Sequence, residues 1–463
     1  MANSILKRIL KIFGIDKAIA FTSGARIVQA FTGVGSVFFI ATFLTDIEQG
    51  FYYAFGSILA LQVFFEMGLT GIISQYFSHE VAHLKLNDQL KYEGNLSHLS
   101  RLSSLIRFFV RWYLALSIIC LVVLYLAGFA YFSKYGSVQN PDVHWKGPWL
   151  LICIGTSIKL LQSPFNAGLQ GLGYVKEMSK IVFLQQLIIP IVSWSGLAIG
   201  LNLYVLGIGY ILSVLIWFWN VYKDRLNRIL INLYRGKIEE RVSYWNEIFP
   251  YQWKIALSWI SGYFIFQLFV PVLFVTEGAV IAGKMGLTLQ ALSAIQSLSL
   301  SWMNTKVPLF SGLIAKKEYS ELDNIFSRTL RQMLTVCLML LTIFFTAVWI
   351  LKLTQLSING NIFGNRFLDY LPLLIMFIPI YIDQFVGAWA TYLRCHKQEP
   401  FLLLSVVTGI LCLLSTYFLG HKIGLYGMII GYCIIKISTI FWAYNIFQKK
   451  KLEWHNNKNS ACE

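Results

Sequence analysis

Long apolar segments alternate with short polar connections along most of the chain. Each segment is long enough to cross a hydrocarbon layer of about 30 Å as a helix. The pattern predicts twelve membrane-spanning helices, six on each side of a polar interval near the middle of the sequence. The predicted spans cover residues 20–44, 51–77, 105–132, 148–170, 181–200, 201–222, 255–275, 278–303, 330–351, 367–393, 401–420 and 424–447.

The polar interval at residues 223–254 is the longest one between apolar segments. It is rich in Lys and Arg, which is typical of a connection on the cytoplasmic side of a membrane. We therefore expect an N-terminal lobe at residues 1–222, a basic linker at 223–254 and a C-terminal lobe at 255–463. Residues 5–13 place apolar and basic side chains on opposite helical faces, which predicts an interfacial amphipathic helix at the start.

The composition supports this membrane interpretation. Hydrophobic residues make up 57% of the 463-residue chain, charged residues only 13%, and the mean hydropathy is +0.62. These values predict an all-α polytopic membrane protein. The formal charge of +16 does not indicate nucleic-acid binding, because the basic residues gather at the ends of apolar segments. The seven cysteines are scattered without C-x-x-C spacing, so neither a disulfide framework nor a metal or other cofactor is predicted.

The distribution of positive charge predicts the orientation of the chain. Most of the 38 Lys and Arg residues lie before the first span, in the even-numbered connections and in the tail. By the positive-inside rule, these segments and both termini face the cytoplasm. The outer connections hold few cations, namely Lys134, Lys146, Lys352, Arg366 and Lys422.

Two segments that lead into spans resemble each other. NLSHLSRLSSLIRFF begins at Asn95 and LDNIFSRTLRQMLTV begins at Leu322, and their shared Ser-Arg pair aligns Arg101 with Arg328. Because six is an even number of spans, two such repeats would run in the same direction through the membrane. A chance match between similar compositions is the alternative.

Four cations fall inside predicted spans: Arg26, Lys159, Lys284 and Lys436. A charge at this depth costs about 2.5 to 3.5 kcal/mol, so we expect these side chains to face a polar cavity and to bind an anionic substrate. Each of them could instead form a structural ion pair. Lys284 lies near the outer end of its span, from which its long side chain could reach the membrane surface.

Polar residues at helical spacing extend this candidate site. In the fourth span a stripe of Thr156, Lys159, Ser163, Asn166 and Gln170 follows steps of three and four residues, which predicts one polar face. Further cavity candidates are Gln29 in the first span, Gln62 in the second and Gln296 in the eighth, where serines recur every four residues. Such stripes also let helices pack closely, which is the structural alternative.

Two carboxylates, Glu66 in the second span and Asp383 in the tenth, are candidates for coupling transport to an ion gradient. A buried carboxyl group can bind a proton in one state of a cavity and release it in another. Either could instead be a fixed counter-charge for an embedded cation. No ATP site is predicted, because the G-x-x-x-x-G-K run that ends at Lys284 is followed by Met285 and not by Ser or Thr.

The chain resembles the polysaccharide-export branch of the multidrug, oligosaccharidyl-lipid and polysaccharide exporter superfamily, which includes the O-antigen flippases. The resemblance rests on Arg26 after a basic amphipathic start, on FFEMGLTGIISQYFSHE from Phe64 and on NAGLQGLGYVKEMSKI from Asn166. It covers the whole chain through loose motifs. It implies two six-helix lobes around a central cavity, which is positively charged in flippases of anionic lipid-linked sugars.

We therefore expect a flippase, not an enzyme, that moves a polyprenyl-pyrophosphate-linked oligosaccharide across a bacterial cytoplasmic membrane. Its expected partners are this lipid-linked oligosaccharide, membrane lipids and a polysaccharide polymerase or glycosyltransferase machinery. An ion-coupled multidrug or small-molecule exporter of the same superfamily is the alternative, although it would favour an acidic or apolar cavity. A membrane sugar polymerase or ligase is a further alternative, but the short outer connections leave no room for a catalytic domain.

Overall fold

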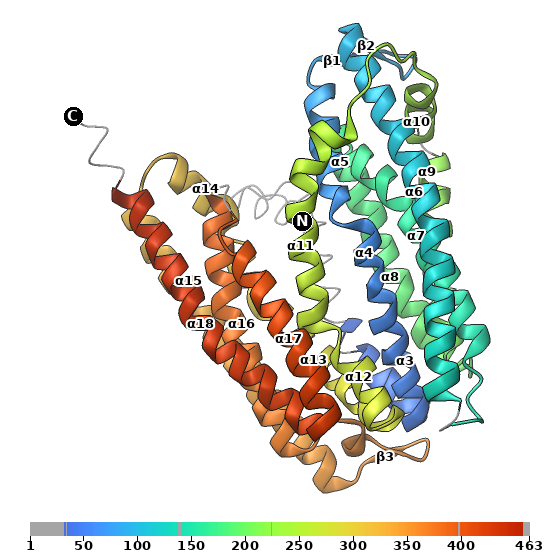
Figure 1. The fold of residues 1–463 in the computed structure, drawn as a ribbon, viewed down its shortest axis with the longest axis vertical. Coiled ribbons are helices and arrows are strands. Elements are labelled where there is room, and N and C mark those ends of the chain that lie inside the picture. Colours follow the sequence, from blue (N-terminus) through green and yellow to red (C-terminus); the bar gives the residue numbers. More distant parts are fainter. Residues whose placement is uncertain (1–31, 34, 138–139, 224, 397–398, 457–463) are drawn as a thin grey trace, which may run out of the picture. The chain divides into compact units, whose positions relative to one another are not determined.

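The structure, a computed structural model, describes residues 32–33, 35–137, 140–223, 225–396 and 399–456. Most of these residues form helices, and the strands are limited to two short hairpins (Figure 1). The described chain forms two compact units. Unit 1 contains Leu59–Ser137 and His144–Trp259, and unit 2 contains Gly33–Ile58 and the chain from Ile260 onward.

Unit 1 is built around α7, which packs against α5, α6, α8 and α9 (Figure 1). Gly171 allows the close approach of α7 to α5, because a Cβ there would lie 2.5 Å from the carbonyl oxygen of Ser74. The elements of unit 1 are η1 (Ala60–Gln62), α4 (Val63–Glu66), α5 (Leu69–Val81), β1 (Leu84–Leu86), β2 (Tyr92–Gly94), α6 (Leu96–Tyr131), η2 (Phe132–Gly136), α7 (Lys146–Gly171), α8 (Val175–Ala198), α9 (Tyr204–Lys223), α10 (Leu226–Arg235) and η3 (Tyr244–Ile248). α11 (Phe249–Phe266) begins in unit 1 and ends in unit 2.

In the basic interval, residues 225–254 pack against the start of α6. The apolar face of α10 is buried against α6 and α9, which explains its amphipathic sequence. After α10, the Ser100 hydroxyl accepts hydrogen bonds from the backbone N–H groups of Glu239 and Glu240 at 2.6 and 2.7 Å. Arg107 donates to the carbonyl of Tyr234 at 2.6 Å. The linker is therefore part of the packing of unit 1.

Unit 2 has two centres of packing. α13 contacts α12, α15 and α16, while α18 contacts α16 and α17. A cluster of large apolar side chains, including Phe326, Trp389, Tyr392 and Phe447, fills the space between α15, α16 and α18. The elements of unit 2 are α3 (Asp46–Leu59), α12 (Phe269–Thr276), α13 (Ala279–Asn304), α14 (Val307–Ala315), α15 (Tyr319–Thr354), β3 (Ser357–Ile358), β4 (Asn361–Ile362), η4 (Phe363–Arg366), α16 (Tyr370–Cys395), α17 (Leu402–Ile423) and α18 (Leu425–Asn456).

A buried polar cluster around Arg366 holds residues 33–58 in unit 2. Arg366 is only 1% exposed, and its guanidinium lies 2.9 Å from the Asp46 carboxylate and donates to the carbonyl of Leu44. Gln49, also 1% exposed, donates to the Arg366 carbonyl at 3.2 Å. Residues 33–58, which the sequence places in the expected N-terminal lobe, therefore belong to unit 2 together with Arg366.

The helix lengths repeat along the chain. α6 and α15 each contain 36 residues, and the helices that follow them, α7 and α16, each contain 26. Arg101 and Arg328, which the sequence comparison aligned, lie near the starts of α6 and α15. This order of lengths agrees with the predicted internal repeat.

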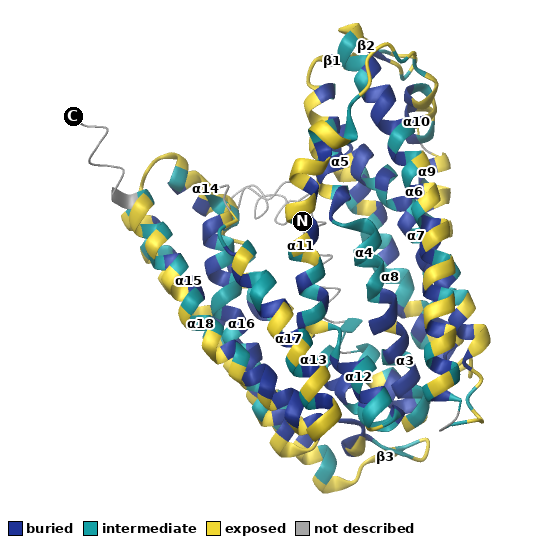
Figure 2. Cartoon of the chain, viewed as in Figure 1, coloured by how far each residue is buried: buried dark blue, intermediate teal, exposed yellow. Residues whose placement is uncertain are grey.

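The chain is an all-α polytopic membrane protein. Eight helices in the described residues are long and apolar enough to cross a membrane, or nine if the bent pair formed by α11 and α12 counts as one span. Along α6 and α15, large apolar side chains such as Ile118, Leu126, Leu338 and Ile343 are exposed, as a lipid-facing surface requires (Figure 2). The predicted spans at α7 and α13 are long enough but more polar, and most of residues 20–44 lies outside the described residues.

The second predicted span is interrupted, contrary to the continuous helix expected at residues 51–77. The chain passes from α3 through a short 3₁₀ turn into α4, and it then breaks at Met67 and Gly68, both with left-handed backbone angles. Gln62 and Glu66 therefore lie before the break, and Thr70 lies after it. The seventh predicted span is also not straight, since α11 and α12 meet at 41°.

Gly68 should be essential to the break in the second span. Its φ is +70°, and a Cβ would lie 2.3 Å from Cγ2 of Ile255. We expect Gly68→Ala to destabilise the protein by about 1 to 3 kcal/mol because it adds backbone strain and a steric clash. The measurement is the thermal unfolding midpoint of the purified protein in detergent. Gly71→Ala, where a Cβ would meet nothing within 4 Å, is the control; equal midpoints for the two variants would contradict an essential role of Gly68.

Candidate functional site

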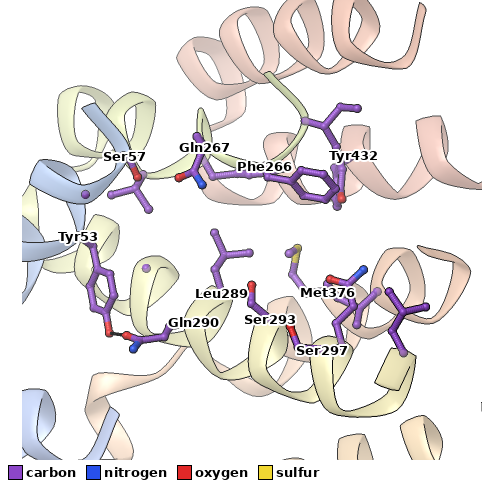
Figure 3. A pocket seen from close by; sticks show the side chains of 18 residues that line it. Tyr53, Ser57, Phe266, Gln267, Leu289, Gln290, Ser293, Ser297, Met376 and Tyr432 are labelled. Atoms are coloured by element: carbon purple, nitrogen blue, oxygen red, sulfur yellow. Dashed lines mark hydrogen bonds between the residues drawn. The ribbon is translucent and has the colours of Figure 1, made fainter. Parts of the chain in front are cut away.

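A cavity of about 630 Å³ lies within unit 2 (Figure 3). α13 forms one wall, on which Leu289, Ser293 and Ser297 follow one another. Phe266 and Gln267, at the end of α11, lie on the opposite side, together with Tyr432 of α18. Residues of α3, α12 and α16 complete the lining.

The cavity wall is uncharged and mainly apolar, with several neutral polar groups set into it. Amide groups come from Gln267, Gln290 and Gln296, and hydroxyl groups come from serines on α3 and α13. The Tyr53 hydroxyl donates a hydrogen bond to the Gln290 side-chain carbonyl (Figure 3). None of the described residues that line the cavity carries a charge. The wall can therefore exchange neutral hydrogen bonds with a ligand in both directions.

The sequence of α13 explains this wall. Ser293, Gln296 and Ser297 are spaced by three and four residues, so they share one helical face. The sequence predicted Gln296 as a cavity residue, and the structure places it in the lining. Close packing of α3 on α13 depends on Gly286, because a Cβ there would lie 2.3 Å from the ring of Tyr53.

Lys436 and Asp383 form a buried ion pair beside this cavity. The Lys436 ammonium lies 2.6 Å from the Asp383 carboxylate, and the two side chains are each 8% exposed. The Tyr432 hydroxyl donates to the same carboxylate at 3.4 Å, and the Lys436 ammonium lies over the rings of Phe266 and Tyr432. Lys436 is therefore not a lining residue, contrary to the expectation. Pairing offsets part of the cost of burying the two charges.

Lys284 lies close enough to Asp369 for their charges to interact, and Asp369 follows the β3–β4 hairpin of unit 2. Lys284 is half-buried on α13, and its positive charge acts on Asp369, which precedes α16. Asp369 accepts a hydrogen bond from Lys352 at 2.7 Å, and this bond, together with the charges of Lys352 and Lys284, lowers the pKa of Asp369. This position agrees with the alternative that the Lys284 side chain reaches the membrane surface.

Lys159 and Glu66 form a second polar group, in unit 1. The Lys159 ammonium lies 4.7 Å from the ring centroid of Tyr210, and its side chain is half-buried. Glu66 ends α4, where the Thr70 hydroxyl bonds its carboxyl group and Lys159 lies within electrostatic range. Lys159 thus remains partly accessible while an opposite charge lies nearby. Such a site can hold an anion or exchange a proton.

The other residues of the fourth-span stripe have different environments. Asn166 accepts a hydrogen bond from the Trp217 indole at 2.6 Å, so it joins α7 to α9. Ser163 is half-buried and donates to the Lys159 carbonyl at 3.4 Å, while Gln170 is exposed. Gln62 is half-buried at the end of η1. Arg26 and Gln29 lie outside the described residues.

Several polar residues in the sites were not predicted from the sequence. Tyr53 and Gln290 line the cavity but were not singled out, although Gln290 precedes Ser293 by three residues and shares its helical face. Gln162 and Gln185 form a buried amide pair in unit 1, with bonds of 3.1 and 3.3 Å. The sequence signal that could have identified the glutamines is an uncharged amide inside a predicted span, because a buried amide needs a hydrogen-bond partner.

No protein-family model matches the sequence, and no curated protein matches it significantly. Solved structures match it over nearly its whole length. The MATE multidrug transporter DinF-BH, in complex with a ligand, gives a TM-score of 0.60 at 13% identity, over 96% of this chain and 97% of that chain. The lipid II flippase MurJ, in an inward closed conformation, gives a TM-score of 0.56 at 14% identity, over 95% and 90%. An inward-facing MATE family transporter of the MOP superfamily gives 0.53 at 12%, over 93% and 99%.

These likenesses establish the fold. The chain has the architecture of multidrug transporters and of a lipid flippase, and identities of 12 to 14% do not separate the two kinds of protein. The all-α membrane fold expected from the sequence is confirmed.

If the Asp383–Lys436 pair is structural, single and double variants should behave differently. Asp383→Asn or Lys436→Met alone should destabilise the protein by about 3 to 5 kcal/mol, because each leaves one buried charge without its partner. The double variant should recover most of this loss, since no buried charge remains. Unfolding midpoints and transport rates of the three variants provide the measurement. A double variant with recovered stability but no transport would show instead that the pair takes part in transport.

Proposed function

We propose that the protein is a flippase that moves a polyprenyl-pyrophosphate-linked oligosaccharide across the membrane by alternating access. The observation that carries this proposal is the set of neutral amide and hydroxyl groups within the mainly apolar, uncharged cavity of unit 2. Sugar hydroxyl groups both donate and accept hydrogen bonds, and the amides and hydroxyls of the cavity wall can do the same. Its volume of about 630 Å³ is in the range of ligand-binding cavities.

Aromatic side chains give the cavity a second means of contact with sugars. Phe266 and Tyr432 contribute rings to the lining, and Tyr432 is held by its hydrogen bond to Asp383. Ring faces provide large and rigid contact areas, which suit the apolar faces of sugar rings. In a neutral wall, each ring and each hydrogen-bonding group contacts a sugar only weakly. Such a wall allows release as well as binding, and a flippase needs both.

Lys159 supports the lipid-pyrophosphate part of the proposal. It is a half-buried cation whose neighbours include an aromatic ring, so its charge acts in a region of low dielectric constant. A pyrophosphate would be attracted to this group more strongly than to a lysine in water. Arg26, predicted from the sequence, would add a second cation.

The alternative is an ion-coupled multidrug or small-molecule exporter. One observation favours it: Glu66 is a half-buried carboxyl group that could attract a cationic substrate or carry a proton. The nearby charge of Lys159 opposes a cationic substrate, and we therefore place the exporter second. The matching structures include a lipid II flippase and a ligand-bound multidrug transporter, so both classes occur on this fold.

We also propose a location and partners for the flippase. The distribution of Lys and Arg supports a bacterial cytoplasmic membrane with both termini in the cytoplasm. A lipid-linked oligosaccharide that has crossed the membrane must then be polymerised or transferred. The enzymes that assemble and polymerise the glycan are therefore the expected functional partners.

Cavity variants of unit 2 should separate the two functions. We expect Gln290→Leu and Gln296→Leu to reduce glycan export about tenfold, because each replaces a neutral hydrogen-bonding group with an apolar one. The measurements are surface glycan and the accumulated lipid-linked intermediate in cells that lack the chromosomal gene. Gln332→Leu, on the exposed face of α15, is the matched control. Reduced efflux of a cationic dye with normal glycan export would favour the multidrug exporter.

Replacement of Lys159 tests recognition of the anionic headgroup. Lys159→Met should lower glycan export at least about tenfold, since a lost charged hydrogen bond costs about 1.5 to 3 kcal/mol. Lys159→Arg should retain part of the activity because it keeps the charge. Lys176→Met, at an exposed position at the start of α8, controls for the loss of one positive charge. Unchanged export by Lys159→Met, at normal membrane levels, would contradict a role in binding pyrophosphate.

A further inference from the structure

A second cavity, of about 760 Å³, lies wholly within unit 1. It is formed by the end of α5, the start of α6, η3 and α11, near the β1–β2 hairpin (Figure 1). The positive-inside rule predicts that this end of the unit faces the cytoplasm. Its lining includes neither Lys159 nor any residue of the cavity in unit 2.

The two carboxylates of this cavity are already engaged. The Glu80 side chain is 3% exposed, and its carboxylate lies 2.9 Å from Nε of Arg101 and 2.7 Å from Nδ1 of His98. Glu247 accepts from Nη2 of Arg101 at 2.6 Å and from the backbone N–H of Ser243 at 2.9 Å. Arg101 is therefore fixed between two acids, which hold its guanidinium in one orientation.

The groups that remain for a ligand are mainly hydrogen-bond donors. Arg101 has five N–H donors, and its two ion-pair contacts leave further donors on the guanidinium. Lys254 lines the cavity, is exposed, and has no carboxylate within ion-pair distance among the described residues. His79 also lines the cavity and is exposed. An acceptor-rich, negatively charged ligand fits this arrangement.

The remaining walls limit the kind of anion. Ile72 and Ile255 provide apolar contact, and Tyr76 is held in place because its hydroxyl donates to the Glu247 carbonyl at 2.6 Å. A metal site is not indicated, since no group of His, Cys, Asp and Glu in the described residues could hold an ion. An oriented Arg and an exposed Lys next to apolar and aromatic surface are suited to a phosphate ester or pyrophosphate.

We propose that the cavity of unit 1 between α5, α6 and α11 is a binding site for a phosphate or pyrophosphate group, with Arg101 and Lys254 as its cationic ligands. The group can belong to an anionic lipid headgroup or to a soluble phosphate compound. Arg101 is oriented before the ligand arrives, so binding does not require a rearrangement of the guanidinium. The two cations balance the two acids, and Lys254, which neither acid holds, is the cation that a phosphate can contact directly.

The test is a calorimetric titration of the purified full-length protein with inorganic pyrophosphate, which measures the binding affinity. Lys254→Gln is the first variant, because Lys254 is exposed and its loss leaves no buried charge unpaired. We expect this variant to weaken pyrophosphate binding about tenfold. Arg328→Gln is the matched control: Arg328 is exposed on α15 at the position that the repeat aligns with Arg101. His79→Gln is a second variant and should also weaken binding.

A second arm identifies the source of the phosphate. The titration is repeated in nanodiscs of phosphatidylcholine with and without phosphatidic acid. If the site takes a lipid headgroup, phosphatidic acid should reduce the apparent pyrophosphate affinity of the wild type. If it takes a soluble compound, the affinity should be the same in both nanodiscs. Absence of pyrophosphate binding in detergent and in phosphatidylcholine nanodiscs would overturn the proposal, as would equal affinities of Lys254→Gln, His79→Gln and the wild type.

Discussion

A charge inside the hydrocarbon layer is stable only when it is paired or when it faces a polar space, and this constraint accounts for much of the structure. In unit 2 the Lys436 ammonium is paired with Asp383 behind the cavity, so the cavity wall can be neutral. In unit 1, Lys159 remains half-buried over an aromatic ring with Glu66 in electrostatic range. The neutral and the charged sites are therefore built by different means.

Because the second span is interrupted, its two parts can belong to different units. α3, in unit 2, contributes Tyr53 to the cavity, whereas α5, in unit 1, packs against α7. The change from one unit to the other falls between Ile58 and Leu59, directly before the 3₁₀ turn Ala60–Gln62, and the break at Gly68 follows one short helix later. Short 3₁₀ segments in the middle of a helix often occur at functional bends. One span can thus take part in both units.

The sequence was sufficient for the fold class and for part of the site. Apolar length predicted the helices, and the repeated serines predicted the polar face of α13 that includes Gln296. The pairing of Lys436 with Asp383 could not be predicted, because 53 residues separate them and either could have faced a cavity. The break at Met67 and Gly68 was missed because an apolar residue followed by one glycine also occurs within continuous membrane helices.

The measurement that tests the central claim most directly is transport by the purified protein in proteoliposomes. A fluorescent polyprenyl-pyrophosphate oligosaccharide and a lipophilic cationic dye are offered separately, and movement of each across the bilayer is followed by quenching with a membrane-impermeant reagent. The neutral cavity of unit 2 and the accessible Lys159 predict that the lipid-linked oligosaccharide is translocated and that the dye is not. Transport of the dye without translocation of the lipid-linked oligosaccharide would contradict the account.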